Sequence, residues 1–95
     1  MTPQHFSALF TDLYEVTMAQ AYMALRMSGT AVFETMFRKL PKGRSYVMAA
    51  GLSDVLDFLE TFQFRPEDID YLRGLRLFTQ DFLRSLSAVR FTGDV

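Results

Sequence analysis

Apolar residues recur at helical spacing near the amino terminus of this 95-residue chain. Within residues 13–27 the positions that recur at this spacing are Leu13, Val16, Met23 and Met27. Asp12 precedes them and Glu15 stands three residues later, which is the spacing of a capping box. In that motif each side chain bonds the free backbone N–H of the other residue. The pattern predicts a helix over residues 13–27 that ends at Ser28-Gly29.

The period then changes from a helical one to a period of two residues. In the stretch AVFETMFRK, residues 31–39, one face carries Ala31, Phe33, Thr35 and Phe37, and the other carries Val32, Glu34, Met36 and Arg38. Pro41 and Gly43 in the next stretch predict a turn. Residues 46–51, YVMAAG, predict either a second buried strand or the start of a helix. A hairpin of the two segments is one arrangement, and the loop is long enough to permit others.

Three short helices are expected in the second half of the chain. Ser53 is a candidate cap for the first, Pro66 and Gly74 suit the start and the end of the second, and Thr79 suits the cap of the third. Alternation returns in the last residues, 88–95, and predicts a strand with no visible partner after it. The order of elements predicts an α+β domain, with helices on a small sheet, that is incomplete at Val95.

The chain carries more large apolar residues than one small core hides. It has ten phenylalanines, four tyrosines and six methionines, and 49% of its residues are hydrophobic. We interpret the excess as surface for a partner chain or for another part of the same polypeptide. Five methionines are interpreted as filler of a core or an interface: Met18, Met23, Met27, Met36 and Met48.

Charge and composition exclude several classes of function. A formal net charge of -1 gives no global footprint for nucleic acid or an anionic membrane. The absence of cysteine excludes disulfides and thiolate metal sites, and it fits a cytoplasmic protein. Asp12 and Glu15 within the first twenty residues argue against a signal peptide. A stretch of roughly 20 apolar residues, as a membrane span needs, is missing.

Few residues point to chemistry by themselves. The sequence contains no glycine-rich nucleotide loop and no nucleophile elbow. His5, the one histidine, is interpreted as incidental. Tyr14 offers a ring that can stack on a flat ligand, although its spacing alone favours ordinary packing. The acidic residues after Pro66 are interpreted as helix-start and surface charges: Glu67, Asp68 and Asp70.

A basic run surrounds the predicted turn. Its members are Arg38, Lys39, Lys42 and Arg44. Four cations within seven residues suit a phosphate or diphosphate group, and the planar fork of Arg38 can bind such oxygens bidentately. The alternative is a solvated turn with basic side chains.

Four stretches in order carry a family resemblance: FTDLYEVTMAQAY, FETMFRKLPKGRSYVMAAGL, FRPEDIDYLRGLRLF and FLRSLSAVRFTGDV. From Leu9 to Val95 the chain resembles the amino-terminal region of nicotinate phosphoribosyltransferase. The TDLY and MFRKLP blocks are its specific markers, and Met36 stands where the family more often has an aromatic residue. The resemblance implies an enzyme of NAD biosynthesis that forms nicotinate mononucleotide from nicotinate and phosphoribosyl diphosphate, with ATP and Mg²⁺. It also implies a homodimer of longer chains, each combining an α+β amino-terminal domain with an α/β barrel absent here.

The resemblance also implies roles for individual residues. Tyr14 is expected against the pyridine ring in the neighbouring subunit's pocket, with Asp12 as cap and pocket wall and Thr17 on the same wall. Arg38 is expected on the phosphates of the phosphoribosyl substrate, with Lys39 and Arg44 as weaker candidates. The family's catalytic residues belong to the barrel, so none is expected in this chain, and His5 matches none of them.

Two other functions remain open at this point. A relative that uses nicotinamide is one, although its start differs from TDLYEVT. A non-catalytic module that caps or dimerises with a full-length homologue is the other. In every case the 95-residue chain alone is expected to be inactive.

Overall fold

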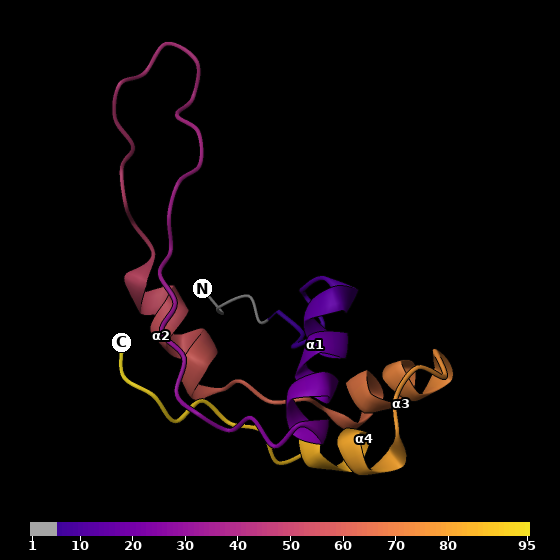
Figure 1. The fold of residues 1–95 in the computed structure, drawn as a ribbon. Helices are drawn as coiled ribbons and strands as arrows, with labels where there is room; N and C mark the ends of the chain where they lie inside the picture. Colours follow the sequence, from indigo (N-terminus) through magenta and orange to yellow (C-terminus); the bar gives the residue numbers. More distant parts are fainter. Residues whose placement is uncertain (1–5) are drawn as a thin grey trace.

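Four helices make up the regular structure of the chain in the computed structural model, which describes residues 6–95. They are α1 (Leu13–Ala24), α2 (Leu52–Glu60), α3 (Pro66–Gly74) and α4 (Gln80–Leu86) (Figure 1). Residues 6–95 contain no β-strand, so the helical part of the predicted α+β fold is observed and the sheet is not. None of the helices in this range is long and apolar enough to cross a membrane.

The starts of α3 and α4 follow the local chemistry that the sequence predicts. Pro66 occupies the first turn of α3, and the Arg65 N–H donates to the Asp68 carboxylate at 2.9 Å. The Thr79 hydroxyl accepts from the Phe82 N–H at 3.2 Å and caps α4. Each bond satisfies a backbone donor that the helix itself leaves free. The predicted positions of Pro66, Gly74 and Thr79 are confirmed.

The ends of α1 and α2 differ from the prediction. Gly51 precedes α2 with φ 101°, and Ser53 lies inside the helix instead of capping it. The last turn of α1 closes at Arg26, because the Met27 N–H donates to the Tyr22 carbonyl at 2.9 Å and the Arg26 N–H to the Met23 carbonyl at 3.1 Å. This pair of bonds is a Schellman motif, with Arg26 in the left-handed position at φ 56°. The helix therefore ends before Ser28-Gly29.

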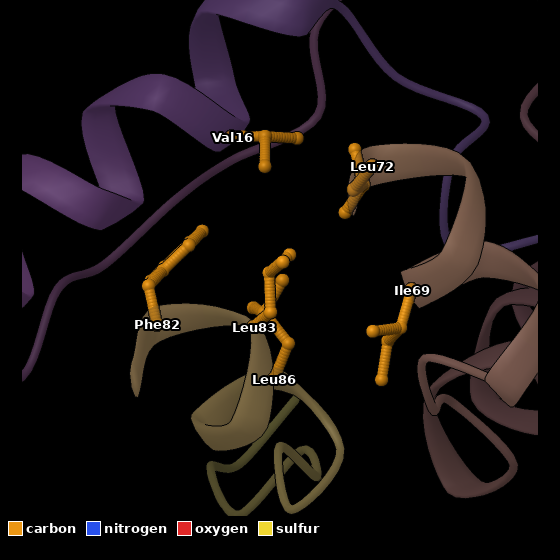
Figure 2. Close-up of a cluster of buried hydrophobic side chains, with 6 residues drawn as sticks. All are labelled: Val16, Ile69, Leu72, Phe82, Leu83 and Leu86. Carbon is orange, nitrogen blue, oxygen red and sulfur yellow. The ribbon is translucent and has the colours of Figure 1, made fainter. Parts of the chain in front are cut away.

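The core lies where α1, α3 and α4 meet. Its six buried side chains point toward one another in Figure 2: Val16, Ile69, Leu72, Phe82, Leu83 and Leu86. Leu72 and Leu83 are the most deeply buried of them, with 2% and 1% of their surface exposed. Helix α2 has no buried residue, so the stable packing is that of the other three helices.

Two polar groups fasten distant segments to this core. The Gln20 amide donates to the Leu77 carbonyl at 3.2 Å and accepts from the Thr79 N–H at 2.9 Å, which joins α1 to the α3–α4 connection. The Ser7 hydroxyl donates to Asp68 at 2.8 Å and joins the amino-terminal segment to α3. Asp68 is 7% exposed, so its interpretation as a surface charge is wrong, although its helix-start role is correct.

Residues 25–51 leave the helical body as a long extended excursion (Figure 1). The predicted strand 31–39 is absent, and so is the one expected in residues 88–95. Residues 46–51 do not form a strand either, and they lead directly into α2 at Leu52, as the alternative of a helix entry predicts. Strands need a partner, and an isolated two-stranded hairpin is marginal in water. The radius of gyration is 16.2 Å, whereas a compact domain of this length has about 12 Å. The chain is more open than a self-contained domain.

The predicted turn between these segments is present. The Arg44 N–H donates to the Pro41 carbonyl at 3.1 Å, and Gly43 has φ 84°. Such a positive φ at the third position of a turn is typical of type II geometry, for which glycine is the favoured residue. The turn therefore forms from its own residues without a sheet around it.

The expected surplus of apolar surface is also present. Val32 and Phe33 are 93% and 90% exposed, and they belong to opposite faces of the predicted strand. The five methionines assigned to a core or an interface are all exposed, so none belongs to the core of this chain. Their role in an interface stays a prediction.

Truncating Leu83 tests the helical core. Leu83→Ala should lower the free energy of unfolding of the chain by about 2–5 kcal/mol, because it leaves a cavity among packed side chains. The matched control is Leu52→Ala, at a position that is 64% exposed, where about 0.5 kcal/mol or less is expected. Urea unfolding followed by far-UV circular dichroism measures both. Equal midpoints for the two variants would contradict the packing described here.

Candidate functional site

The first turn of α1 does not form the predicted capping box. Asp12 occupies the N-cap position with extended backbone, but its side chain makes no capping hydrogen bond. Its carbonyl accepts from the Glu15 N–H at 3.1 Å, while the Glu15 carboxylate accepts from the Thr11 hydroxyl. Thr11 thus takes the partner that Asp12 was expected to have. The Asp12 carboxylate remains exposed at the mouth of the helix.

Tyr14 lies on the outer side of α1. It is two residues before Val16, and at 3.6 residues per turn two residues differ by about 200° around a helix. Because Val16 is buried against α3 and α4, Tyr14 faces away from the core, and 59% of its surface is exposed. Core packing is therefore excluded as its role within this chain.

The electrostatic surroundings of the Tyr14 hydroxyl disfavour its ionisation. Its pKa is raised above the ordinary value of 10.0, first by the charge of Glu15 and then by that of Asp12, with smaller effects from desolvation and a hydrogen bond to Glu15. The phenol is neutral at every physiological pH and remains a hydrogen-bond donor. The start of α1 accordingly presents a ring face, an O–H donor and two carboxylates.

The Thr17 hydroxyl is less available to bind a ligand than the resemblance implies. Its hydroxyl donates to the Tyr14 carbonyl at 2.9 Å, a bond back to the preceding turn that is common for threonine in helices. The side chain is half-buried. Its hydroxyl oxygen keeps acceptor capacity.

The basic residues lie on a different part of the chain. Arg38, Lys39 and Arg44 are exposed on the excursion between α1 and α2, away from the helical body that carries Tyr14 (Figure 1). The ion pairs among residues 6–95 are Arg73–Asp70 and Arg84–Asp81, so none of these cations has a carboxylate partner there. The structure does not bring the two groups of predicted site residues together.

A cavity of about 250 Å³ lies elsewhere, between the amino-terminal segment, the end of α2 and the start of α3. Phe58, Phe62 and Asp68 are among its walls, and none of the predicted site residues lines it. Both Asp68 oxygens are already engaged, one by Ser7 and one by Arg65. Asp68 therefore acts in the structure of the chain.

Sequence reasoning missed the long-range hydrogen bonds of two residues, Gln20 and Asp68. Gln20 holds α1 to the α3–α4 connection, and its polar side chain among apolar neighbours was the available signal. Asp68 stands three residues after Arg65 and just inside Pro66, which is a helix-start signature, but nothing local reveals its bond to Ser7. His5 lies outside the described residues. Within residues 6–95, no three histidine or acidic side chains are grouped to hold a metal ion.

Comparison with known proteins identifies the domain. The family model of the nicotinate phosphoribosyltransferase N-terminal domain matches residues 9–95. The chain belongs to this family. The predicted resemblance is thereby confirmed over nearly the whole chain.

Similar proteins are found in bacteria and in animals. The chain is 72% identical over 92 residues to nicotinate phosphoribosyltransferase pncB2 of Mycobacterium tuberculosis, covering 97% of this chain and 20% of that protein. It is 45% identical over 68 residues to the human nicotinate phosphoribosyltransferase, covering 70% of this chain and 13% of that protein. The Bacillus subtilis nicotinate phosphoribosyltransferase is 36% identical over 77 residues, with coverages of 80% and 16%. No solved structure matches the chain significantly. The chain thus spans about a fifth of the mycobacterial relative's length.

In this nicotinate phosphoribosyltransferase N-terminal domain, titration tests the surroundings of Tyr14. The phenol should ionise above the ordinary tyrosine pKa of 10.0, because its anion would lie beside two carboxylates. Glu15→Gln removes the larger of the two charges and should bring the Tyr14 pKa back toward 10.0. Glu34→Gln, on the distant excursion, is the matched control and should leave it unchanged.

The absorbance of the phenolate is followed as the pH rises. The curve of the same protein with Tyr14→Phe is subtracted, so that the signal of the other tyrosines cancels and the pKa of Tyr14 remains. Any interaction made by the neutral phenol is present below pH 10 and is lost as the pH rises through the raised pKa. An unshifted Tyr14 pKa in the unsubstituted chain would show that the carboxylates lie farther from the ring.

Proposed function

We propose that the chain is the amino-terminal part of an enzyme that forms nicotinate mononucleotide from nicotinate and phosphoribosyl diphosphate, coupled to ATP hydrolysis. The observation that carries the proposal is the 72% identity over 97% of this chain to a protein named nicotinate phosphoribosyltransferase. The match of the family model over residues 9–95 supports it. Because the chain spans 20% of that relative, the reaction belongs to the longer protein, and the chain alone is inactive.

The proposed contribution of α1 is one wall of the nicotinate pocket in the neighbouring subunit of a homodimer. Tyr14 supplies the stacking face, while Asp12 and Thr17 complete the wall. Three features of the helix support this role: the ring is exposed, its hydroxyl stays protonated, and α1 is held by Val16 and Gln20. A rigid helix that presents an aromatic ring outward suits recognition of a flat heterocycle.

The proposed contribution of the excursion is part of the clamp on the phosphoribosyl diphosphate. Arg38 is the principal ligand, with Lys39 and Arg44 beside it. Their exposure and their lack of carboxylate partners among residues 6–95 leave the charges available for phosphate oxygens. Family membership implies ATP and Mg²⁺ for the longer enzyme, and no role toward them is proposed for residues of this chain.

The proposed setting is a cytoplasmic homodimer of longer chains. In it the domain is α+β, residues 31–39 and 46–51 are strands, and the sheet continues with polypeptide beyond the matched region toward an α/β barrel. The exposed apolar side chains support a large interface. The same side chains equally suit a non-catalytic module that binds a full-length homologue. A measurement of activity therefore distinguishes the enzyme from the module.

A chimeric protein tests the enzyme against the module. This chain replaces the matching region of the Mycobacterium tuberculosis relative, and formation of nicotinate mononucleotide is measured with phosphoribosyl diphosphate and ATP. We expect kcat/KM within about tenfold of the parent, a change of about 1.4 kcal/mol in the barrier. Each part alone is the control and should be inactive. A folded dimeric chimera without activity would favour the module, and a preference for nicotinamide would favour the nicotinamide-using relative.

Mixed dimers of the same chimera test the position of Tyr14. Tyr14→Phe keeps the stacking face and should cost little, whereas Tyr14→Ala should lower kcat/KM by about 2- to 10-fold, since stacking contributes roughly 0.5–1.5 kcal/mol beyond burial. A Tyr14→Ala subunit is then paired with one whose own pocket is disabled downstream of the domain. If Tyr14 acts in the neighbour's pocket, both defects fall in one site and the other site is intact. If instead the one working site of the mixed dimer shows the 2- to 10-fold loss of Tyr14→Ala, with subunit exchange verified, Tyr14 acts in its own chain's pocket.

A further inference from the structure

Residues 7–11 fold into a turn that leads directly into α1. The Phe10 N–H donates to the Ser7 carbonyl at 3.0 Å. The Thr11 N–H donates to the Leu9 carbonyl at 2.7 Å. The turn is continuous with the N-cap of the helix, so its conformation fixes the direction in which the chain enters α1.

The Ser7 hydroxyl joins this turn to the start of α3. It accepts from the Leu9 N–H at 3.0 Å and donates to one oxygen of Asp68 at 2.8 Å. The other Asp68 oxygen accepts from the Arg65 N–H at 2.9 Å. Because Asp68 is buried, a partner that it loses is not freely replaced by water. One carboxylate therefore holds the start of α3 and the approach to α1 in a single arrangement.

The turn also reaches the carboxylate beside Tyr14. The Thr11 hydroxyl donates to Glu15, and the charge of Glu15 is the largest cause of the raised pKa of Tyr14. The Leu9 backbone connects the two ends of the turn, because its N–H bonds the Ser7 hydroxyl and its carbonyl bonds the Thr11 N–H. Hydrogen bonds thus link the start of α3 to the group that surrounds the Tyr14 hydroxyl.

Apolar burial is the competing reason for the position of this turn. Ala8 is 9% exposed, and Leu9 packs against the core. Apolar contact is non-directional, so it holds the segment near the core without selecting one position for the Thr11 hydroxyl. The bonds of Ser7 are directional and can select that position.

We propose that Ser7 and Asp68 are positioning residues for the wall of the nicotinate pocket that Tyr14 forms. They act through the turn and the Thr11–Glu15 bond, and they touch no substrate themselves. The inference rests on the proposed function of α1. A wall that is ordered before the substrate arrives spares the substrate the cost of ordering it. Loss of the Ser7–Asp68 bond should therefore weaken the binding of nicotinate and leave the reacting groups unchanged.

Amide hydrogen exchange of the chain tests the link from α3 to α1. Ser7→Ala removes the hydroxyl, and the Leu9 and Glu15 amides should then exchange about tenfold faster, since a hydrogen bond to a charged group contributes on that order. The amides of α3 and α4 should stay protected, which shows that the fold is intact. Ser87→Ala is the matched control, because that hydroxyl bonds the Arg84 carbonyl at 2.7 Å at the end of α4. It should leave the Leu9 and Glu15 amides unchanged.

Two conservative variants separate the hydrogen bond from the size of the side chain. Ser7→Thr keeps the hydroxyl and should keep the slow exchange. Asp68→Asn keeps an oxygen for the Arg65 N–H, and its amide can donate to the Ser7 oxygen. It should therefore also keep the slow exchange. If Ser7→Thr and Asp68→Asn both matched Ser7→Ala, the hydroxyl–carboxylate bond would not be the cause.

Kinetics of the chimeric protein test the effect on the pocket. Ser7→Ala should raise the KM for nicotinate about 3- to 10-fold and leave kcat and the KM for phosphoribosyl diphosphate within about twofold, because only ring binding is weakened. Ser7→Thr should restore the KM. In a Tyr14→Ala background, Ser7→Ala should have little further effect, since the ring that it positions is gone. A merely structural role would instead lower the use of both substrates together.

Two outcomes would overturn the inference. One is an unchanged exchange rate of the Glu15 amide in the Ser7→Ala chain. The other is an active chimera in which Ser7→Ala leaves the KM for nicotinate unchanged, or raises it equally with and without the Tyr14 ring. A chimera that forms no nicotinate mononucleotide, while exchange in the chain responds as expected, would refute the proposed function alone, because exchange is measured without turnover.

Discussion

The burial of Val16 against α3 and α4 sets the orientation of α1. It is the buried residue of that helix, and Gln20 one turn later fastens the same side to the α3–α4 connection. Because these two positions fix which side faces inward, Tyr14 and Met18 must face outward. One valine contributes roughly 1.5–3 kcal/mol when fully buried, so the placement of the candidate ligand wall depends on a small amount of packing. The hydrogen bonds of the Gln20 side chain are directional, so they fix the orientation of α1 more sharply than this small apolar contact does alone.

Local chemistry made the helices of the second half predictable. Pro66 in the first turn, Gly74 at the end and Thr79 at a cap all act within a few residues of their own position. The same reasoning failed at Asp12, because Thr11 competes for the Glu15 carboxylate and sequence spacing does not rank the two. It also failed for Asp68, whose burial depends on Ser7, distant in sequence. Local rules give the elements, and distant bonds decide which polar residues are buried.

The strands were not observed because their stability is not local. Alternation in residues 31–39 describes which faces a strand would present, but it supplies neither a partner nor a cover. The candidate site likewise has one part that local sequence determines and one part that it does not. The outward position of Tyr14 follows from its spacing to Val16, while the position of Arg38 relative to Tyr14 requires structure that these residues do not determine. The raised pKa of Tyr14 arises from Glu15 and Asp12, its close neighbours, and was within reach of the sequence.

The open excursion has a consequence for synthesis of the longer protein proposed here. An amino-terminal domain leaves the ribosome first, and at roughly 5–20 residues per second a partner several hundred residues downstream follows tens of seconds later. During that interval the apolar side chains of the excursion are exposed to other nascent chains. Glu34 and the cations Arg38 and Lys39 interrupt the apolar run, as the charged residues that limit aggregation of unpaired strands do. The basic residues proposed to hold phosphate in the finished enzyme would therefore also limit aggregation of the nascent chain until synthesis is complete.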